Sequence, residues 1–347
     1  MANSHGFLSR RGFIKVLSGS AVTAVLAGRS GAADAFGLLQ FFDGGSKARH
    51  VTPYITPNKD FYVVAVDPSF RPQVTPASVQ GNWALKMVDL SGGVQHLEWH
   101  ALMQQANRTV VKTFECIGNP VGGSLISNAR WHVIPLKSLL RKLAGVHSAK
   151  SVMFRSLDDF YASISIERCL DDYAFLALRM NGEPLPPVHG FPARVLLPDL
   201  YGMEQPRWLT RIELQRTANT TSYWQERGWA GEVPVKTMSR LDPPGPVQAD
   251  QQVVLTGVAY AGHRGIKAVE VSLDDGKHWV PCQLKHADHP DAWSLWRYDW
   301  RRPTSGHHEL MVRATDGDGH VQTATRHGRS PAGASGYDHL SVGVRKA

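Results

Sequence analysis

The chain has 347 residues, and its 38 Lys and Arg against 30 Asp and Glu give a formal net charge of +8. This basic balance favours anionic ligands or an acidic partner protein, but the basic residues are scattered and form no cluster with stacking aromatics, so we expect no nucleic-acid binding. Three cysteines are too few for a disulfide scaffold. No C-x-x-C-H haem attachment run occurs, so any haem must sit on another protein.

The first segment predicts export. Arg10 and Arg11 precede a mildly apolar run over residues 16–27, which is typical of a twin-arginine signal. A membrane anchor is the alternative, but spanning needs about 18 or more apolar residues, and this run is shorter and interrupted by polar residues. An A-x-A-like site at 33–35 places the signal peptide at residues 1–35. We therefore expect the twin-arginine translocase to deliver a soluble protein to the periplasm.

A mixed α+β domain is predicted for residues 50–240. Strand-like segments occur at 83–88, 108–114, 151–154 and 209–214, and helical periodicity occurs at 100–105 and 135–143. No G-x-G-x-x-G run follows any of these strands, so a nicotinamide-binding doubly wound sheet is disfavoured.

A second domain is predicted for residues 247–347, after a proline-rich hinge at 241–246 where we expect no continuous secondary structure. Short strands separated by turn signals favour a β-sandwich of immunoglobulin type. These strands are expected at 253–257, 268–272, 292–298, 309–315, 321–323 and 340–344.

Two runs carry the chemistry: Cys116 in Glu115-Cys116-Ile117-Gly118-Asn119, and the later His189-Gly190-Phe191-Pro192-Ala193-Arg194. A thiolate is a soft ligand that suits a transition metal, and His and Arg are donors that a phosphorylated organic cofactor needs. Taken singly, the cysteine could be a buried apolar residue, and the His and Arg could be structural loop residues. The two runs together predict a metal site with an organic cofactor.

In this order and at this separation, the two runs resemble the sulfite oxidase family of molybdopterin enzymes, and the resemblance covers nearly all of the chain after the signal. It implies that Cys116 ligates molybdenum in a Mo-molybdopterin cofactor. It further implies cofactor contacts from the segment around Tyr62 and from Asp158, His189, Arg194 and Arg207. Other runs that carry the resemblance are Asn128-Ala129-Arg130-Trp131, Arg207-Trp208-Leu209 and Tyr223-Trp224-Gln225.

The departures from the family pattern concern the substrate. Val64 and Val121 stand where sulfite-oxidising relatives carry arginines, and Trp229 replaces the active-site Tyr. Arg264 matches the arginine that reaches the catalytic pocket from the second domain. Desolvating a small dianion without paired donors is unfavourable, so we expect a neutral or singly charged sulfur or nitrogen oxo compound as substrate.

The resemblance implies oxygen-atom transfer at the metal, with electrons exchanged with a separate haem protein such as a c-type cytochrome. In relatives the second domain often mediates dimers, which makes a homodimer the expected assembly. Two alternatives remain open: a sulfite dehydrogenase with a rearranged anion pocket, and a non-catalytic binding module that retains the cofactor fold.

Overall fold

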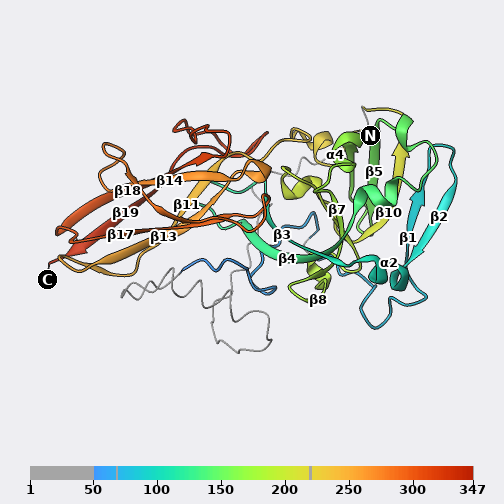
Figure 1. Cartoon of the computed structure of the whole chain (residues 1–347), viewed down its shortest axis with the longest axis horizontal. Coiled ribbons are helices and arrows are strands. Elements are labelled where there is room, and N and C mark those ends of the chain that lie inside the picture. The colour runs from blue at the N-terminus through green and yellow to red at the C-terminus, as the bar shows by residue number, and fades with distance from the viewer. Residues whose placement is uncertain (1–50, 68, 219–220, 347) are drawn as a thin grey trace, which may run out of the picture. The chain divides into compact units, whose positions relative to one another are not determined.

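The computed structural model describes residues 51–67, 69–218 and 221–346, and the predicted signal peptide lies outside them. In the described part, β-strands dominate and the helices are short (Figure 1). These helices are α2 (Trp99–Gln105), α3 (Leu136–Leu140) and α4 (Ile166–Cys169). The helix expected at 100–105 is confirmed by α2, whereas the one expected at 135–143 ends early, at Leu140.

Two sheets carry the first half of the described chain. One is a five-stranded sheet in the order β2-β1-β10-β5-β6, in which β1 and β10 are parallel and the other pairs are antiparallel. Figure 1 shows β2, β1, β10 and β5 side by side. Its strands are β1 (Ala84–Val88), β2 (Val94–Glu98), β5 (Ser151–Ser156), β6 (Tyr161–Ser165) and β10 (Leu209–Gln215).

The second of these sheets is antiparallel, with the order β3-β4-β7-β8 and with β9 also paired to β7. Both sheets contribute to one apolar core, which includes Leu85, Trp131, Phe154 and Leu176. The strands are β3 (Arg108–Glu115), β4 (Ile126–Pro135), β7 (Phe175–Met180), β8 (Glu183–Pro184) and β9 (Arg194–Leu196).

Two further sheets enclose a second core and form the orange-to-red group of long strands in Figure 1. Their orders are β11-β13-β17-β16 and β12-β19-β18-β14-β15. Along β19, Val342 and Val344 are buried while Ser341, Gly343 and Arg345 are exposed, as the period of two requires. The strands are β11 (Met238–Asp242), β12 (Val247–Gln248), β13 (Val253–Tyr260), β14 (Ile266–Ser272), β15 (Val280–Pro281), β16 (Gln283–Lys285), β17 (Ser294–Trp300), β18 (Gly306–Asp316) and β19 (Asp338–Arg345).

Most strands expected from the pattern are confirmed, and two expectations are wrong. The segment 321–323 makes only an isolated bridge, Val321 to Thr315, and is not a strand. The hinge expected at 241–246 begins inside β11, because Leu241 and Asp242 pair with Gly257 and Thr256 of β13. The division into domains at 50–240 and 247–347 stays a prediction. In the described ranges, no helix is long and apolar enough to cross a membrane.

Candidate active site

Cys116 directly follows β3, in a loop that is tightly hydrogen-bonded. The Cys116 amide donates to the Leu125 carbonyl at 2.9 Å, and the Asn119 amide donates to the Cys116 carbonyl at 2.8 Å. The Asn119 side chain closes the loop, because its amide donates to Glu115 Oε1 at 3.0 Å and its oxygen accepts from the Leu125 amide at 3.0 Å. The Asn119 side chain of the Cys-x-Gly-Asn run therefore fixes the backbone before and after Cys116.

The thiol of Cys116 is half-buried, and burial raises its pKa to about 11. The Gly118 amide, 3.4 Å from Sγ, and the charge of Arg329 act in the opposite direction. A bound metal would hold the sulfur as thiolate through its own charge. Among the described residues, Cys116 belongs to no cluster of three or more metal-ligating side chains.

Two arginines that form no close ion pair in the described ranges mark a candidate anion site, although the charge of Asp158 acts on Arg207. Arg194, at the start of β9, is 7% exposed and donates to the His189 carbonyl at 3.1 Å, while its Nε has no partner. Arg207 donates only to the carbonyls of Val188 and Val64, at 2.8 and 3.1 Å. Neither forms an ion pair with a carboxylate in the described ranges. Burial lowers the pKa of Arg194 to about 9 and that of Arg207 to about 10.

Glycine brings these two arginines together. Gly190 has φ +117°, and a Cβ at this position would lie 2.7 Å from the Cβ of Arg207 and 3.2 Å from the Cβ of Arg194. Only a residue without a side chain permits this backbone conformation and this approach. Burying guanidinium groups without a counter-charge is costly, and a phosphate would supply bidentate, charge-assisted hydrogen bonds. The residues present therefore fit a phosphorylated cofactor.

His189 lies beside the arginines, at the end of a 3-10 helix, Pro187–His189. Its Nε2 is 2.9 Å from the Asn58 carbonyl, which can only accept, so this nitrogen carries the proton. Burial lowers the pKa of His189 to about 4, so the ring is neutral near neutral pH. The side chain expected to be a donor to the cofactor therefore offers Nδ1 as an acceptor.

Tyr62 and Asp158 interact electrostatically with the arginine pair. The Tyr62 amide donates to Ser127 Oγ at 3.1 Å, so that backbone group is already used. Burial raises the pKa of Tyr62 well above its usual value, and the charges that act on it include those of Cys116, Arg194 and Arg207. Asp158 is half-buried, which raises its pKa, and the charge of Arg207 opposes that effect. Tyr62 thus links the surroundings of the sulfur with those of the arginine pair.

Arg264 is not a free cation. Its Nε donates to Asp316 at 3.1 Å, Nη1 to Asp199 at 3.0 Å and Nη2 to the Val235 carbonyl at 2.8 Å. Two carboxylates thus compensate the guanidinium, so its role in the catalytic pocket stays a prediction without a supporting contact. Trp229 packs edge-on against Trp224, with ring centroids 6.5 Å apart, and its role also stays a prediction.

The structure brings a different cation to the cysteine loop. Arg329, from the loop before β19, places Nη1 3.4 Å from the carbonyl of Gly118, two residues after Cys116. Its charge lowers the pKa of Cys116. Sequence reasoning missed this residue because it lies in a Gly/Ser/Ala-rich segment with no motif, more than 200 positions from Cys116. Val64, which is 47% exposed, and the half-buried Val121 provide apolar surface.

Comparisons with known proteins agree with this geometry. Residues 72–224 match the oxidoreductase molybdopterin binding domain, and residues 236–332 match the Mo-co oxidoreductase dimerisation domain. Mitochondrial sulfite oxidase from Rattus norvegicus is 29% identical over 317 residues, and that from Macaca fascicularis is 30% identical over 320. The chain belongs to the sulfite oxidase family of molybdopterin oxidoreductases. Mo-molybdopterin is the cofactor that this membership implies.

The extent of these matches differs between relatives. Each of the two mitochondrial sulfite oxidases matches 78% of this chain, which spans 58% of the length of either relative. Nitrate reductase [NADH] 1 from Arabidopsis thaliana is 28% identical and matches 53% of this chain and 26% of its own. The sulfane dehydrogenase SoxCD structure from Paracoccus pantotrophus shares the fold, with a TM-score of 0.71 at 20% identity over 84% of this chain and 82% of that one.

Proposed function

We propose that the protein is an exported molybdopterin-dependent oxidoreductase in which Cys116 ligates the molybdenum. The observation that carries the proposal is the buried Arg194 beside Arg207, two cations that form no close ion pair with a carboxylate of the described residues. Together with Gly190 they form a receptor for the cofactor phosphate. Tyr62, whose pKa responds to both Cys116 and Arg194, joins this receptor to the cysteine loop. When bound, the cofactor supplies two-electron oxygen-atom transfer.

The side chains of the pocket define the substrate class. Arg329 is an exposed cation that contacts the Cys116 loop at Gly118, and Val121 lies in that same loop. One cation with apolar surface suits a singly charged sulfur or nitrogen oxo compound that also has an apolar part. A sulfite dehydrogenase is the second candidate, because Arg329 is a cation beside the Cys116 loop that could contact an anion and because sulfite oxidases are among the relatives.

Cys116→Ser tests the assignment of the metal ligand. A hydroxyl is a poor substitute for a thiolate at a soft metal, so the variant should fold and retain the pterin phosphate but lose turnover with every oxyanion or S-oxide that the wild type accepts. Metal analysis and activity with an artificial electron acceptor measure this. Wild-type turnover by the variant would remove Cys116 from the site. A wild-type protein that binds no molybdenum would instead support the alternative of a non-catalytic module.

The second pair of sheets suits an immunoglobulin-like domain that forms a homodimer. Support comes from the shared core of the two sheets and from the match to a dimerisation domain. A c-type cytochrome is proposed as the electron partner, because the chain has no haem attachment run. Sedimentation of the purified protein, alone and with such a cytochrome, tests both assemblies.

A further inference from the structure

The segment 327–335 is a closed loop that carries Arg329. His327 and Ser335 exchange backbone hydrogen bonds of 3.1 and 3.4 Å, which close its base. Inside the loop, the Gly333 amide donates to the Arg329 carbonyl at 2.7 Å. Hydrogen bonds within the loop therefore fix the backbone around Arg329, although the Arg329 side chain is exposed.

Residues outside the loop contact its tip, which comprises residues 329–333. Lys236 Nζ donates to the Gly333 carbonyl at 2.6 Å, and the Lys236 amide donates to the Tyr201 hydroxyl at 3.2 Å. The Ala230 amide donates to the Pro331 carbonyl at 3.1 Å. These contacts come from the stretch between β10 and β11 and from the loop after β9, so they join the tip to the part of the chain that carries Cys116.

Gly333 is required where the tip meets Tyr201. Its φ is +82°, and a Cβ there would lie 2.6 Å from the Tyr201 hydroxyl. The Tyr201 ring is itself fixed, because it is only 3% exposed. A glycine in the left-handed region thus allows the loop to lie directly against a rigid hydroxyl.

Among the described residues, the Arg329 side chain makes one weak hydrogen bond, which joins it to the Gly118 carbonyl at 3.4 Å. Such a contact is too small to hold a long, exposed side chain against its conformational entropy. We propose that Lys236 and Tyr201 are positioning residues, which clasp the 329–333 segment so that Arg329 stands beside the Cys116 loop. This inference rests on the proposed function, in which Arg329 attracts an anionic substrate.

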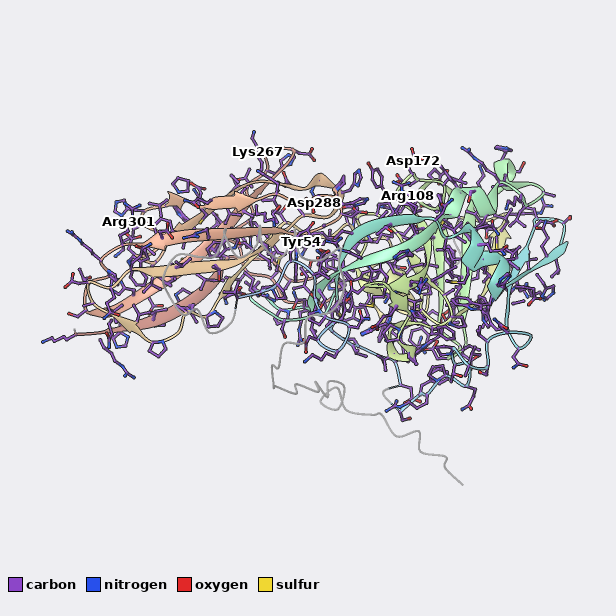
Figure 2. All side chains as sticks on the ribbon, turned by 60° about the horizontal axis from the view of Figure 1, so that its bottom comes forward. Tyr54, Arg108, Asp172, Lys267, Asp288 and Arg301 are labelled. Carbon is purple, nitrogen blue, oxygen red and sulfur yellow. The ribbon has the colours of Figure 1, made fainter. Side chains whose placement is uncertain are left out.

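Limited trypsin digestion of the full-length purified holoenzyme tests the clasp without measuring turnover. In Lys236→Met, cleavage after Arg329, quantified by mass spectrometry, should be faster by about ten-fold, the factor that corresponds to one lost charge-assisted hydrogen bond. Lys236→Arg retains a donor and should restore the wild-type rate. Lys267→Met, at an exposed lysine labelled in Figure 2, is the matched control and should leave the rate unchanged. Equal cleavage in Lys236→Met and wild type would overturn the proposal.

Kinetics separate positioning from general stability. With sulfite and an artificial electron acceptor, Lys236→Met and Arg329→Gln should each raise KM several-fold with little change in kcat, and the double variant should be no worse than Arg329→Gln alone. Additive effects would contradict the clasp. If neither the wild type nor any variant oxidises sulfite, the sulfite dehydrogenase alternative is wrong, whereas the digestion still decides the clasp. Gly333→Ala, which displaces the tip from Tyr201, provides the same digestion test if Lys236→Met does not fold.

Discussion

At the scale of single residues, a charge change near the sulfur should control anion affinity. Val121 follows Cys116 by five positions, and Arg329 contacts the same loop at Gly118. A partly desolvated cation contributes about 1 to 3 kcal/mol per charge-assisted contact, or roughly ten-fold in affinity. The described residues place one such cation, Arg329, beside the Cys116 loop, where sulfite-binding relatives are expected to have more.

Val121→Arg should accordingly increase sulfite-dependent reduction of an artificial acceptor at low sulfite, and Arg329→Gln should decrease it. Val121→Leu, which changes size but not charge, is the control and should have little effect. The measurement is kcat/KM for sulfite in purified protein. If the wild type already oxidises sulfite with micromolar KM, the inference from Val64 and Val121 is wrong and the sulfite dehydrogenase alternative is favoured.

At the scale of elements, the short 3-10 helix Gly202–Glu204 carries a buried carboxyl whose environment predicts a pH effect on stability. Glu204 is 1% exposed, its Oε1 accepts from the Glu232 amide at 3.2 Å, and Oε2 has no partner. Burial raises the pKa of Glu204 to about 7. The stabilising contribution of such a group is complete below its unfolded pKa and is lost as pH rises through the folded pKa.

Glu204→Gln should therefore reduce the loss of stability between pH 5.5 and pH 8.5. Over that interval this carboxyl should lower the free energy of unfolding of the wild type by about 2 kcal/mol, because only the wild type must ionise a buried group. Thermal unfolding midpoints at the two pH values measure the difference. Glu98→Gln, at an exposed position, is the control and should keep the wild-type dependence. An identical pH dependence in Glu204→Gln would show that the carboxyl does not titrate as described.

At the scale of the whole molecule, a buried ion pair ties the strand that leads to Cys116 to the second pair of sheets. Lys112 of β3 lies 3.2 Å from Asp291, and the two side chains are 1% and 0% exposed. The Thr113 amide donates to the Asp291 carbonyl at 2.9 Å, and the Trp293 amide donates to Thr113 Oγ1 at 2.9 Å. Tyr54 and Asp288, labelled in Figure 2, extend this junction through a 3.1 Å hydrogen bond from the Asp288 amide.

Lys112→Met should lower the free energy of unfolding by about 3 to 5 kcal/mol, because it leaves the buried Asp291 with only the half-exposed His263, 3.4 Å away, as a charge partner. Replacing both residues, as Lys112→Met with Asp291→Asn, should recover part of that loss, since no uncompensated charge remains. Thermal or urea unfolding of the single and double variants measures the coupling. A single variant as stable as the wild type would show that the pair contributes nothing at this junction.

The proposed export would depend on residues outside the described ranges. Changing Arg10→Lys together with Arg11→Lys should trap the precursor in the cytoplasm if the predicted twin-arginine signal is the one that is recognised. Fractionation of cells that express either form checks this, and a variant with Lys15→Ala alone is the control. Normal export of the double variant would rule out the twin-arginine route.

Local sequence determined much of this protein. Alternation of buried and exposed residues identifies β19, and a run of β-branched residues identifies β13. The order of side chains along a strand is enough to show whether one face or both faces are buried. The Cys-x-Gly-Asn run and the His-Gly-Phe-Pro-Ala-Arg run likewise identify their loops, since each closes through neighbouring residues: Asn119 with Glu115, and Arg194 with His189.

Only the tertiary structure decided which cation contacts the Cys116 loop. Arg264 matches the expected position but is compensated by Asp199 and Asp316, whereas Arg329 arrives from a segment without a motif. Both outcomes depend on contacts between residues more than 50 positions apart, which no local pattern encodes. In the described ranges, Arg194 and Arg207 donate to backbone carbonyls and form no close ion pair, which is also a tertiary property because it depends on which side chains the fold brings near them.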